Sequence, residues 1–176
     1  VLFRSDWAFR LGDDTAAARL DYNDADWRKL NLPHDWAVEG EFSRDNPSGT
    51  GGGALPGGIG WYRKHFDIND YSKSKRYYLD FDGVYMNSTV YVNGNELGKR
   101  PYGYSSFRYD ITQYVKKSGN VVAVRVDNSD QPNSRWYSGC GIYRNVYLVE
   151  TGNIHVAHWG SFVTASQNGD MNIDIS

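Results

Sequence analysis

The feature of the sequence that most restricts the fold is a series of short strand-like segments separated by turn residues. These segments are rich in aromatic and β-branched side chains, recur at near-regular spacing, and are not interrupted by a long amphipathic helix pattern. Such a series predicts an all-β fold, an antiparallel sandwich, with a jelly roll as the expected version. We expect strands near residues 6–11, 30–32, 61–66, 76–81, 87–92, 96–100, 107–111, 121–126 and 143–149.

Local signals refine this prediction. Residues 121–126 place three valines on one face of a strand, where they would point into the core. Asn93-Gly94 marks a tight hairpin, because the central residues of such a turn adopt positive φ. Short helical turns are expected at residues 24–29 and 112–117.

Residues 37–60 form a long connection that is loaded with glycine from Gly49 to Gly60. The connection lacks the Gly-Lys-Ser/Thr ending of a P-loop and precedes a strand, so it is not a phosphate-binding loop. A connection of this length inside a compact domain is either functional or mobile. Its glycines fit both a backbone that packs closely over something and plain flexibility.

The strand pattern restarts after Thr151-Gly152, with segments at residues 154–157, 162–164 and 171–175 and a polar turn at 166–170. Three strands cannot bury a sandwich core by themselves. We therefore expect two units: a jelly-roll domain over residues 1–150, and the start of a truncated second β domain over residues 151–176.

Charge and cysteine content exclude several classes of protein. A net charge of −2 and a pI near 6.1 argue against binding to nucleic acid or to an anionic membrane. No apolar run is long enough to span a bilayer. Cys140 is the single cysteine, so neither an internal disulfide nor a cysteine-based zinc cluster can form. Flanked by glycines, Cys140 is expected to be a small buried filler.

The loop that follows the strand at 121–126 contains more charged and aromatic side chains than a simple connection needs. Residues 133–146 combine Arg135, Trp136 and Tyr137 with two glycines. Aromatic faces beside a guanidinium fork suit a sugar, through stacking on C–H faces and paired bonds to hydroxyls. The alternative is that Trp136 and Tyr137 simply cover the end of a core.

Asp35 has two interpretations. It either forms a turn by accepting hydrogen bonds from nearby backbone N–H groups, or it anchors a ligand. The acids of this region lie close together in sequence in a polar loop, and we expect all of them to be solvated rather than tuned for catalysis. They are Asp35, Glu39, Glu41 and Asp45.

No combination of residues forms a convincing catalytic centre or metal site. A Gly-x-Ser-x-Gly elbow is absent, and the histidines lack metal-ligand spacing supported by other ligands. His155 and His158 would lie on opposite faces of a strand. We expect no catalytic residue, no metal and no cofactor, and ordinary surface or half-buried roles for His34, His65, His155 and His158.

Several motifs, in their order along the chain, make the sequence resemble glycoside hydrolase family 2, and within it the bacterial β-galactosidases. The resemblance covers residues 5–150, which match the family's N-terminal, galactose-binding-like jelly roll, while residues 151–176 resemble the opening strands of its immunoglobulin-like domain. The motifs are Leu32-Pro33-His34-Asp35-Trp36, Gly57-Gly58-Ile59-Gly60-Trp61-Tyr62-Arg63, Phe81-Asp82-Gly83-Val84, Tyr91-Val92-Asn93-Gly94 and Ser134–Val146.

The resemblance implies a supporting role rather than chemistry. The family cleaves terminal β-linked sugars with retention, using two glutamates of a TIM barrel further along the chain. The part described by this sequence would contribute one wall of the sugar pocket and hydrolyse nothing alone. Carried onto matching positions, the sugar contacts are Asp35, Arg135 and Trp136, with Ser134 as an alternate; we expect Asp35 and Arg135 to pair across the pocket rim.

Two further implications concern roles rather than sugar contacts. Several family members carry an acid where Arg135 stands, and a guanidinium cannot coordinate a cation, so no metal is expected there. Asp82 and Asn93 match turn and hairpin positions and should be structural.

We therefore expect the N-terminal, non-catalytic part of an exo-β-glycosidase, foremost a β-galactosidase. Its partners would be a β-linked galactoside or related glycan and the downstream domains of the same chain. By analogy with other family members, we also expect the parent enzyme to be homo-oligomeric and to be periplasmic or secreted. The alternatives are a stand-alone carbohydrate-binding module, an interaction domain without sugar contact, and β-mannosidase or β-glucuronidase specificity within the family.

Overall fold

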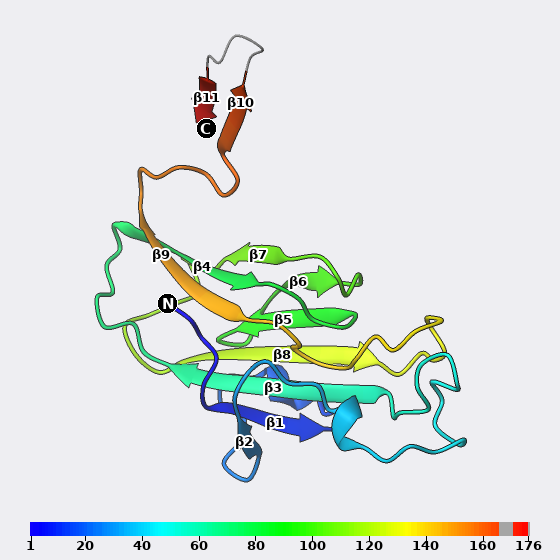
Figure 1. The fold of residues 1–176 in the computed structure, drawn as a ribbon. Helices are drawn as coiled ribbons and strands as arrows, with labels where there is room; N and C mark the ends of the chain where they lie inside the picture. Colours follow the sequence, from blue (N-terminus) through cyan, green and yellow to red (C-terminus); the bar gives the residue numbers. More distant parts are fainter. Residues whose placement is uncertain (166–170, 176) are drawn as a thin grey trace.

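The computed structural model describes residues 1–165 and 171–175, which form an all-β protein of antiparallel sheets (Figure 1). A six-stranded sheet has the order β2-β1-β3-β8-β5-β6, and a three-stranded sheet has the order β7-β4-β9. The strands of the two sheets are β1 (Trp7–Leu11), β2 (Arg28–Leu30), β3 (Gly58–Phe66), β4 (Lys75–Phe81), β5 (Ser88–Val92), β6 (Asn95–Arg100), β7 (Phe107–Asp110), β8 (Asn120–Asn128) and β9 (Val146–Gly152). The predicted antiparallel sandwich is confirmed.

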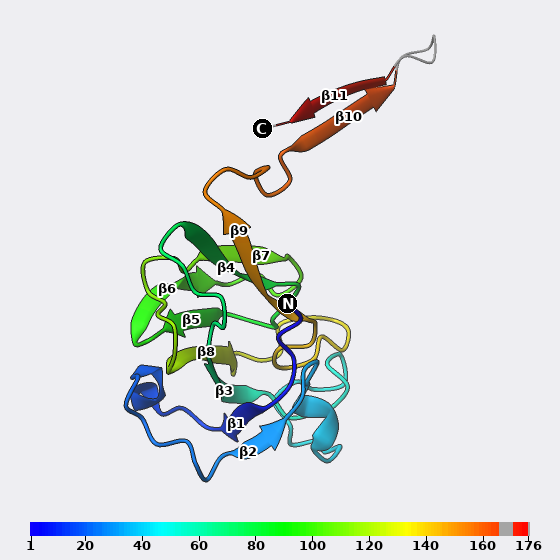
Figure 2. The same cartoon turned by 90° about the vertical axis from the view of Figure 1, so that its left-hand side faces the viewer.

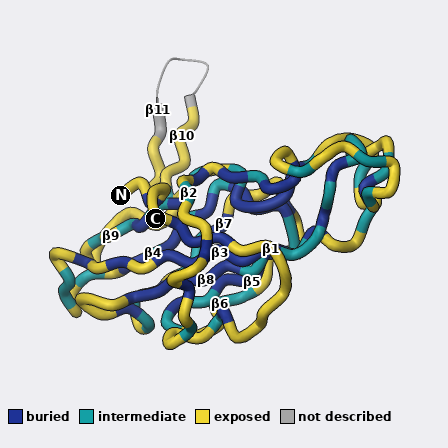
Figure 3. Tube along the Cα trace, turned by 90° about the horizontal axis from the view of Figure 1, so that it is seen from below, coloured by how far each residue is buried: buried dark blue, intermediate teal, exposed yellow. Residues whose placement is uncertain are grey.

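The two sheets enclose one hydrophobic core, and Figure 2 shows them as layers on either side of it. From β8 the core receives Val122, Val124 and Val126, the alternate valines that the sequence places on one face. From the opposite sheet it receives Leu79 and Phe81 of β4, among others. Figure 3 shows buried residues concentrated along the central strands β3, β8 and β5.

Asn93-Gly94 forms the predicted hairpin between β5 and β6, with φ of 52° and 83°. The Asn93 side chain donates to the Tyr114 carbonyl at 2.7 Å and accepts from the Val121 N–H at 2.8 Å. Asn93 is therefore structural, as expected.

A segment that we call the strap, residues 12–27, crosses the outer face of the six-stranded sheet. It contributes Ala17 and Trp27 to a second, smaller hydrophobic cluster, in which the sheet supplies Trp61 and Ala123. The short 3₁₀ helix η1 (Thr15–Ala18) lies within the strap. The strap thus covers apolar side chains that would otherwise face water on the outside of the sandwich.

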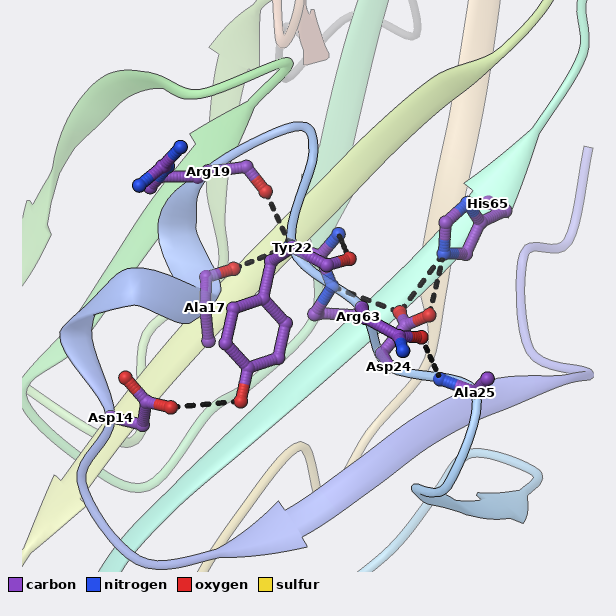
Figure 4. Close-up of polar contacts among 9 residues, drawn as sticks. Asp14, Ala17, Arg19, Tyr22, Asp24, Ala25, Arg63 and His65 are labelled. Atoms are coloured by element: carbon purple, nitrogen blue, oxygen red, sulfur yellow. Dashed lines mark hydrogen bonds and ion pairs between the residues drawn. The ribbon is translucent and has the colours of Figure 1, made fainter.

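Arg63 of β3 fastens the strap to the sheet (Figure 4). Its Nε donates to Asp24 Oδ2 at 2.9 Å, and its guanidinium also donates to the carbonyl oxygens of Ala17, at 2.5 Å, and Arg19, at 2.9 Å. His65 Nε2 lies 2.9 Å from the same carboxylate oxygen of Asp24. A completely buried arginine is tolerated because these partners satisfy its donors.

The local predictions hold in part. A helical turn is present near residues 112–117, where the Ile111 carbonyl accepts the Val115 N–H at 3.2 Å. Residues 24–29 form a single turn, closed by the bond from the Trp27 N–H to the Asp24 carbonyl at 3.1 Å, and β2 begins at Arg28. The second 3₁₀ helix is η2 (Ala37–Glu39). Residues 154–157 pair with no strand in the described chain, and Ile154 is 99% exposed.

The boundaries of two strands also differ from those predicted. β2 ends at Leu30, where residues 30–32 were expected to be the strand. β9 begins only at Val146, and before it the Ile142 and Asn145 carbonyls accept hydrogen bonds from the His34 and Asp82 N–H groups. Beyond β9, strands β10 (Ser161–Ala165) and β11 (Met171–Ile175) form an antiparallel pair, close to the segments expected there. The predicted turn at residues 166–170 lies outside the described residues.

Within residues 1–165 and 171–175, no helix has the length and hydropathy of a membrane span.

Candidate functional site

The candidate site is formed where the loop after β2 meets the loop before β9. The His34 N–H donates to the Ile142 carbonyl at 2.9 Å, and the Trp36 N–H donates to the Cys140 carbonyl at 3.1 Å. These two backbone bonds place Asp35 directly opposite the segment that carries Tyr137.

The Asp35 carboxylate organises this meeting point. Its Oδ1 accepts the N–H of Ala37 at 2.9 Å and the N–H of Cys140 at 2.8 Å. The Tyr137 hydroxyl donates to its Oδ2. Burial and the bond to this carboxylate raise the pKa of Tyr137, so the hydroxyl keeps its proton. Asp35 is a turn-former, and it also holds the loop that carries the other candidate residues.

Glycines at 139 and 141 allow the two loops to approach. Their φ angles are 77° and 122°, a region that favours glycine. A Cβ on Gly139 would lie 2.7 Å from Asp35 Oδ2, and one on Gly141 would collide with the Tyr62 hydroxyl. The glycines that flank Cys140 are therefore required by close packing.

Cys140 is the buried filler that the sequence predicts. Its side chain lies in the hydrophobic core, and Asn128 Nδ2 lies 2.9 Å from its Sγ. Burial raises the pKa of the thiol to about 12, which keeps it protonated and unreactive at neutral pH.

The predicted ligand-binding residues lie at the tip of this loop. The Trp136 side chain is 60% exposed, and its Nε1 donates to the Tyr104 hydroxyl at 2.9 Å. Ser134 Oγ donates to the Trp136 carbonyl at 2.5 Å, which tightens the tip. Arg135 is exposed, and its guanidinium bonds to no residue in the described part of the chain. The expected Asp35–Arg135 pair is not formed there; Tyr137 occupies the Asp35 carboxylate instead.

Tyrosines that the sequence reasoning did not assign to the site complete the aromatic surface. Tyr104 packs edge-on against Tyr85, at a centroid distance of 5.3 Å, and against Tyr102, at 5.6 Å. Tyr102-Gly103-Tyr104 lies in the loop between β6 and β7, and two aromatics in a turn segment were the available signal. Their proximity to Trp136 could not be read from sequence.

The glycine-rich connection packs against the back of the loop tip. A Cβ on Gly57 would lie 2.6 Å from the Asn128 carbonyl oxygen and one on Gly52 would lie 2.6 Å from Ser48 Cβ, whereas Gly51 and Gly53 are only in ordinary contact range of Ser134 and Tyr137. The connection also bonds to itself, for example from the Ala54 N–H to the Gly49 carbonyl at 2.7 Å. Its glycines therefore serve close packing, one of the two interpretations that the sequence left open.

The expectation that the nearby acids are solvated rather than tuned for catalysis holds for Glu39, which is exposed but ion-paired, whereas Asp35 is only partly exposed and accepts backbone hydrogen bonds. Both Glu39 oxygens accept from Arg28, at 2.6 and 2.7 Å. This bidentate bond lowers the pKa of Glu39 to about 2. Glu39 is therefore an ion-pair partner, the opposite of a carboxyl whose pKa is raised for acid catalysis.

The histidines are not arranged for metal binding. His34 is buried, its Nδ1 lies 2.7 Å from the Tyr62 hydroxyl, and burial lowers its pKa. His155 and His158 lie in the loop between β9 and β10, so their placement on opposite faces of a strand was wrong. In the described ranges, no group of three or more His, Cys, Asp and Glu residues could hold a metal ion.

Comparison with known proteins places this geometry in a family. Residues 54–152 match the model of the sugar-binding domain of glycosyl hydrolases family 2. The chain is 63% identical over 165 residues to the β-galactosidase BoGH2A of Bacteroides ovatus, covering 93% of the chain and 19% of that protein. It is 48% identical to a putative β-glucuronidase of Formosa agariphila, covering 98% of the chain and 17% of that protein.

A solved structure of a β-glycosidase is also similar to this chain. The crystal structure of a β-glycosidase from Bacteroides vulgatus superposes with a TM-score of 0.93 at 43% identity, covering 100% of this chain and 24% of that one. The chain thus spans about a fifth of the length of the relatives that it matches, 19% and 17% of the two curated proteins. From the family model, these relatives and the shared sandwich, the chain belongs to family 2 of the glycosyl hydrolases and carries that family's sugar-binding domain.

Proposed function

We propose that this chain is the N-terminal, non-catalytic part of a retaining exo-β-glycosidase, foremost a β-galactosidase, and that it lends one wall to the sugar pocket. The observation that carries the proposal is the loop tip of residues 134–137, exposed at its surface and held from behind by Asp35. The 63% identity to a protein named β-galactosidase supports the choice of sugar.

Each side chain at the tip has a role in this proposal. The exposed Trp136 ring offers a face to sugar C–H groups, and the free Arg135 fork can bond to two neighbouring hydroxyls. The Asp35 carboxylate has lone pairs left for a hydroxyl beside Tyr137, and Ser134 Oγ can accept one more bond. Contacts remote from the reacting bond accelerate catalysis when they position the substrate for the transition state.

Residues 151–176 are proposed to begin the immunoglobulin-like domain that follows. In the β10–β11 pair, apolar side chains are exposed on both strands: Phe162, Val163, Ile173 and Ile175. A two-stranded pair is marginal alone, so these strands need a larger sheet to bury their apolar side chains. We place the boundary between the two units after residue 150.

A β-glucuronidase is the second candidate. Several relatives carry that name, including the one at 48% identity. A uronic acid adds a carboxylate to the sugar, and the exposed Arg135 guanidinium is suited to bind it through two parallel bonds.

Turnover of p-nitrophenyl β-galactoside and p-nitrophenyl β-glucuronide distinguishes these proposals. We would compare this chain with the longer polypeptide that continues into the domains of its relatives. Turnover of the galactoside by the longer polypeptide alone is the expected result. Preference for the glucuronide would favour the second candidate, and turnover by the purified chain itself would contradict a non-catalytic role.

A further inference from the structure

A hollow of about 390 Å³ adjoins the candidate site and has no role in the sugar contacts described above. Its volume falls in the range of about 300–1,000 Å³ that is usual for small-ligand sites. We call it the Arg144 hollow; it is lined by Pro33, Asp82, Tyr104, Ser106, Tyr143, Arg144 and Asn145.

Loops at the ends of the neighbouring strands β4 and β9, together with the β6–β7 loop, supply most of the lining of this hollow. Asp82 follows β4, Asn145 precedes β9, and the Asp82 N–H donates to the Asn145 carbonyl at 3.0 Å. A Cβ on Gly83 would lie 2.8 Å from the Tyr143 ring and 3.1 Å from Arg144 Cδ. Glycine at position 83 therefore leaves the room that these two side chains occupy.

The aromatic part of the lining is held in place. The Tyr143 hydroxyl donates to the Gly103 carbonyl at 2.8 Å, which ties it to the loop that carries Tyr104. The Arg144 guanidinium carbon lies 5.5 Å from the centre of the Tyr143 ring, so the cation stacks beside the aromatic face.

The charged part of the lining is available to a ligand. The side chains of Arg144 and Asp82 form no hydrogen bond or ion pair with any residue of the described ranges. The Asp82 backbone occupies a turn, as the sequence suggested, but its carboxylate is free. A guanidinium donor and a carboxylate acceptor beside tyrosine rings match the alternating hydroxyls and C–H faces of a pyranose.

Two links connect this hollow with the candidate site. Pro33 in its lining is two residues from Asp35. Tyr104 in its lining accepts the hydrogen bond from Trp136 Nε1 at 2.9 Å. A sugar at the loop tip would therefore have its neighbouring residue beside the Arg144 hollow.

We propose that the Arg144 hollow binds the second sugar residue of a β-linked oligosaccharide, the one that leaves when the terminal sugar is cleaved. This inference rests on the proposed function, in which Asp35 and the loop tip hold the terminal sugar. Arg144 and Asp82 grip hydroxyls of the second residue, while Tyr104 and Tyr143 cover its C–H faces.

The test uses the longer polypeptide with β-1,4-linked galactobiose as substrate and galactose as competitive inhibitor of p-nitrophenyl β-galactoside turnover. Galactose occupies only the terminal position, whereas galactobiose occupies both. Arg144→Met is expected to raise KM for galactobiose about tenfold and to leave the inhibition constant of galactose within about twofold. Asp82→Asn should act in the same direction by a smaller factor. Arg10→Met, an exposed arginine of the other sheet, is the matched control and should change neither constant.

The outcomes separate this inference from the proposed function. Equal changes in both constants for Arg144→Met and Asp82→Asn, or no change in either, would overturn the subsite while leaving the proposed function intact. A lowered thermal transition with equal changes would assign Arg144 to packing against another part of the protein, which also overturns the subsite. Absence of turnover on galactosides and glucuronides alike would overturn the proposed function and the subsite with it, and turnover of glucuronides alone would favour the second candidate and overturn a subsite for galactobiose.

Discussion

Two arginines of this protein, Arg63 under the strap and Arg135 at the loop tip, stand in opposite environments. Arg63 is 0% exposed and donates to a carboxylate and to carbonyl oxygens of the strap (Figure 4). Arg135 is exposed and bonds to nothing in the described chain. The first arginine has its donors satisfied by the fold, so it stabilises; the second has its donors exposed, and under the proposed function they are available to a sugar.

The largest effect is expected for Arg63→Ala. The change removes the Arg63 guanidinium from the buried Asp24 carboxylate, which keeps only His65 as a partner, and it releases the strap carbonyl oxygens that Arg63 binds. We expect the free energy of unfolding to fall by about 3–5 kcal/mol, measured by urea denaturation. Arg10→Ala is the matched control and should stay within about 0.5 kcal/mol. A loss below about 1 kcal/mol for Arg63→Ala would remove the distinction between the two arginines.

Asp35→Ala comes next, because it affects both stability and sugar binding. It removes the acceptor of two backbone N–H groups, which should lower the free energy of unfolding by about 1–3 kcal/mol without unfolding the domain. In the longer polypeptide it should also raise KM for a β-galactoside. Unchanged kinetics beside an intact thermal transition would contradict a sugar contact by Asp35.

Trp136→Ala tests the exposed loop tip, where we expect a change in sugar binding rather than in stability. Because the ring is exposed, the free energy of unfolding should change by less than about 0.5 kcal/mol. Sugar binding should weaken by about 1–2 kcal/mol, measured as the change in KM or in a galactose inhibition constant. Trp159→Ala is the control, since Trp159 is 82% exposed on the β9–β10 loop. Equal effects of both substitutions would argue against a specific contact.

The smallest expected effect is the pH dependence of the Glu39–Arg28 pair. The pKa of Glu39 is lowered from 4.5 to about 2, so the pair stabilises fully above about pH 4.5 and its contribution is lost as the pH falls toward 2. The Glu39 side chain is 38% exposed, and solvent screening limits the contribution to less than about 1 kcal/mol. The stability difference between the protein and Glu39→Gln should therefore vanish between pH 4.5 and pH 2. A difference that persists at pH 2 would contradict this assignment.

Local patterns allowed the sandwich to be predicted. The alternate valines of β8 and the Asn93-Gly94 turn each depend on neighbours in sequence, so their period and turn chemistry identify them directly. The strap could not be predicted, because the carbonyl oxygens that hold Arg63 lie more than forty residues away, at separations of 46 and 44. Patterns among neighbouring residues therefore could not place residues 12–27 over the sheet.

The candidate site, too, was predictable from the sequence only in part. Asp35 and the residues of the loop tip were identifiable from residue type, and their contact with sugar stays a prediction. Their arrangement was not identifiable, because Tyr137 and Asp35 are 102 residues apart and Trp136 and Tyr104 are 32 apart. For this reason the expected partner of Asp35 was the arginine rather than the tyrosine.

The contacts that hold the backbone of the loop do not involve the exposed side chains at positions 135 and 136. Asp35, Asn128 and the glycines around Cys140 set the path of the backbone, while the side chains of Arg135 and Trp136 are exposed and take no part in those contacts. Positions 135 and 136 can therefore be varied together without a loss of fold. If the loop tip contacts the sugar as proposed, exchanging these few side chains would alter the preference between neutral and acidic sugars without rebuilding the scaffold.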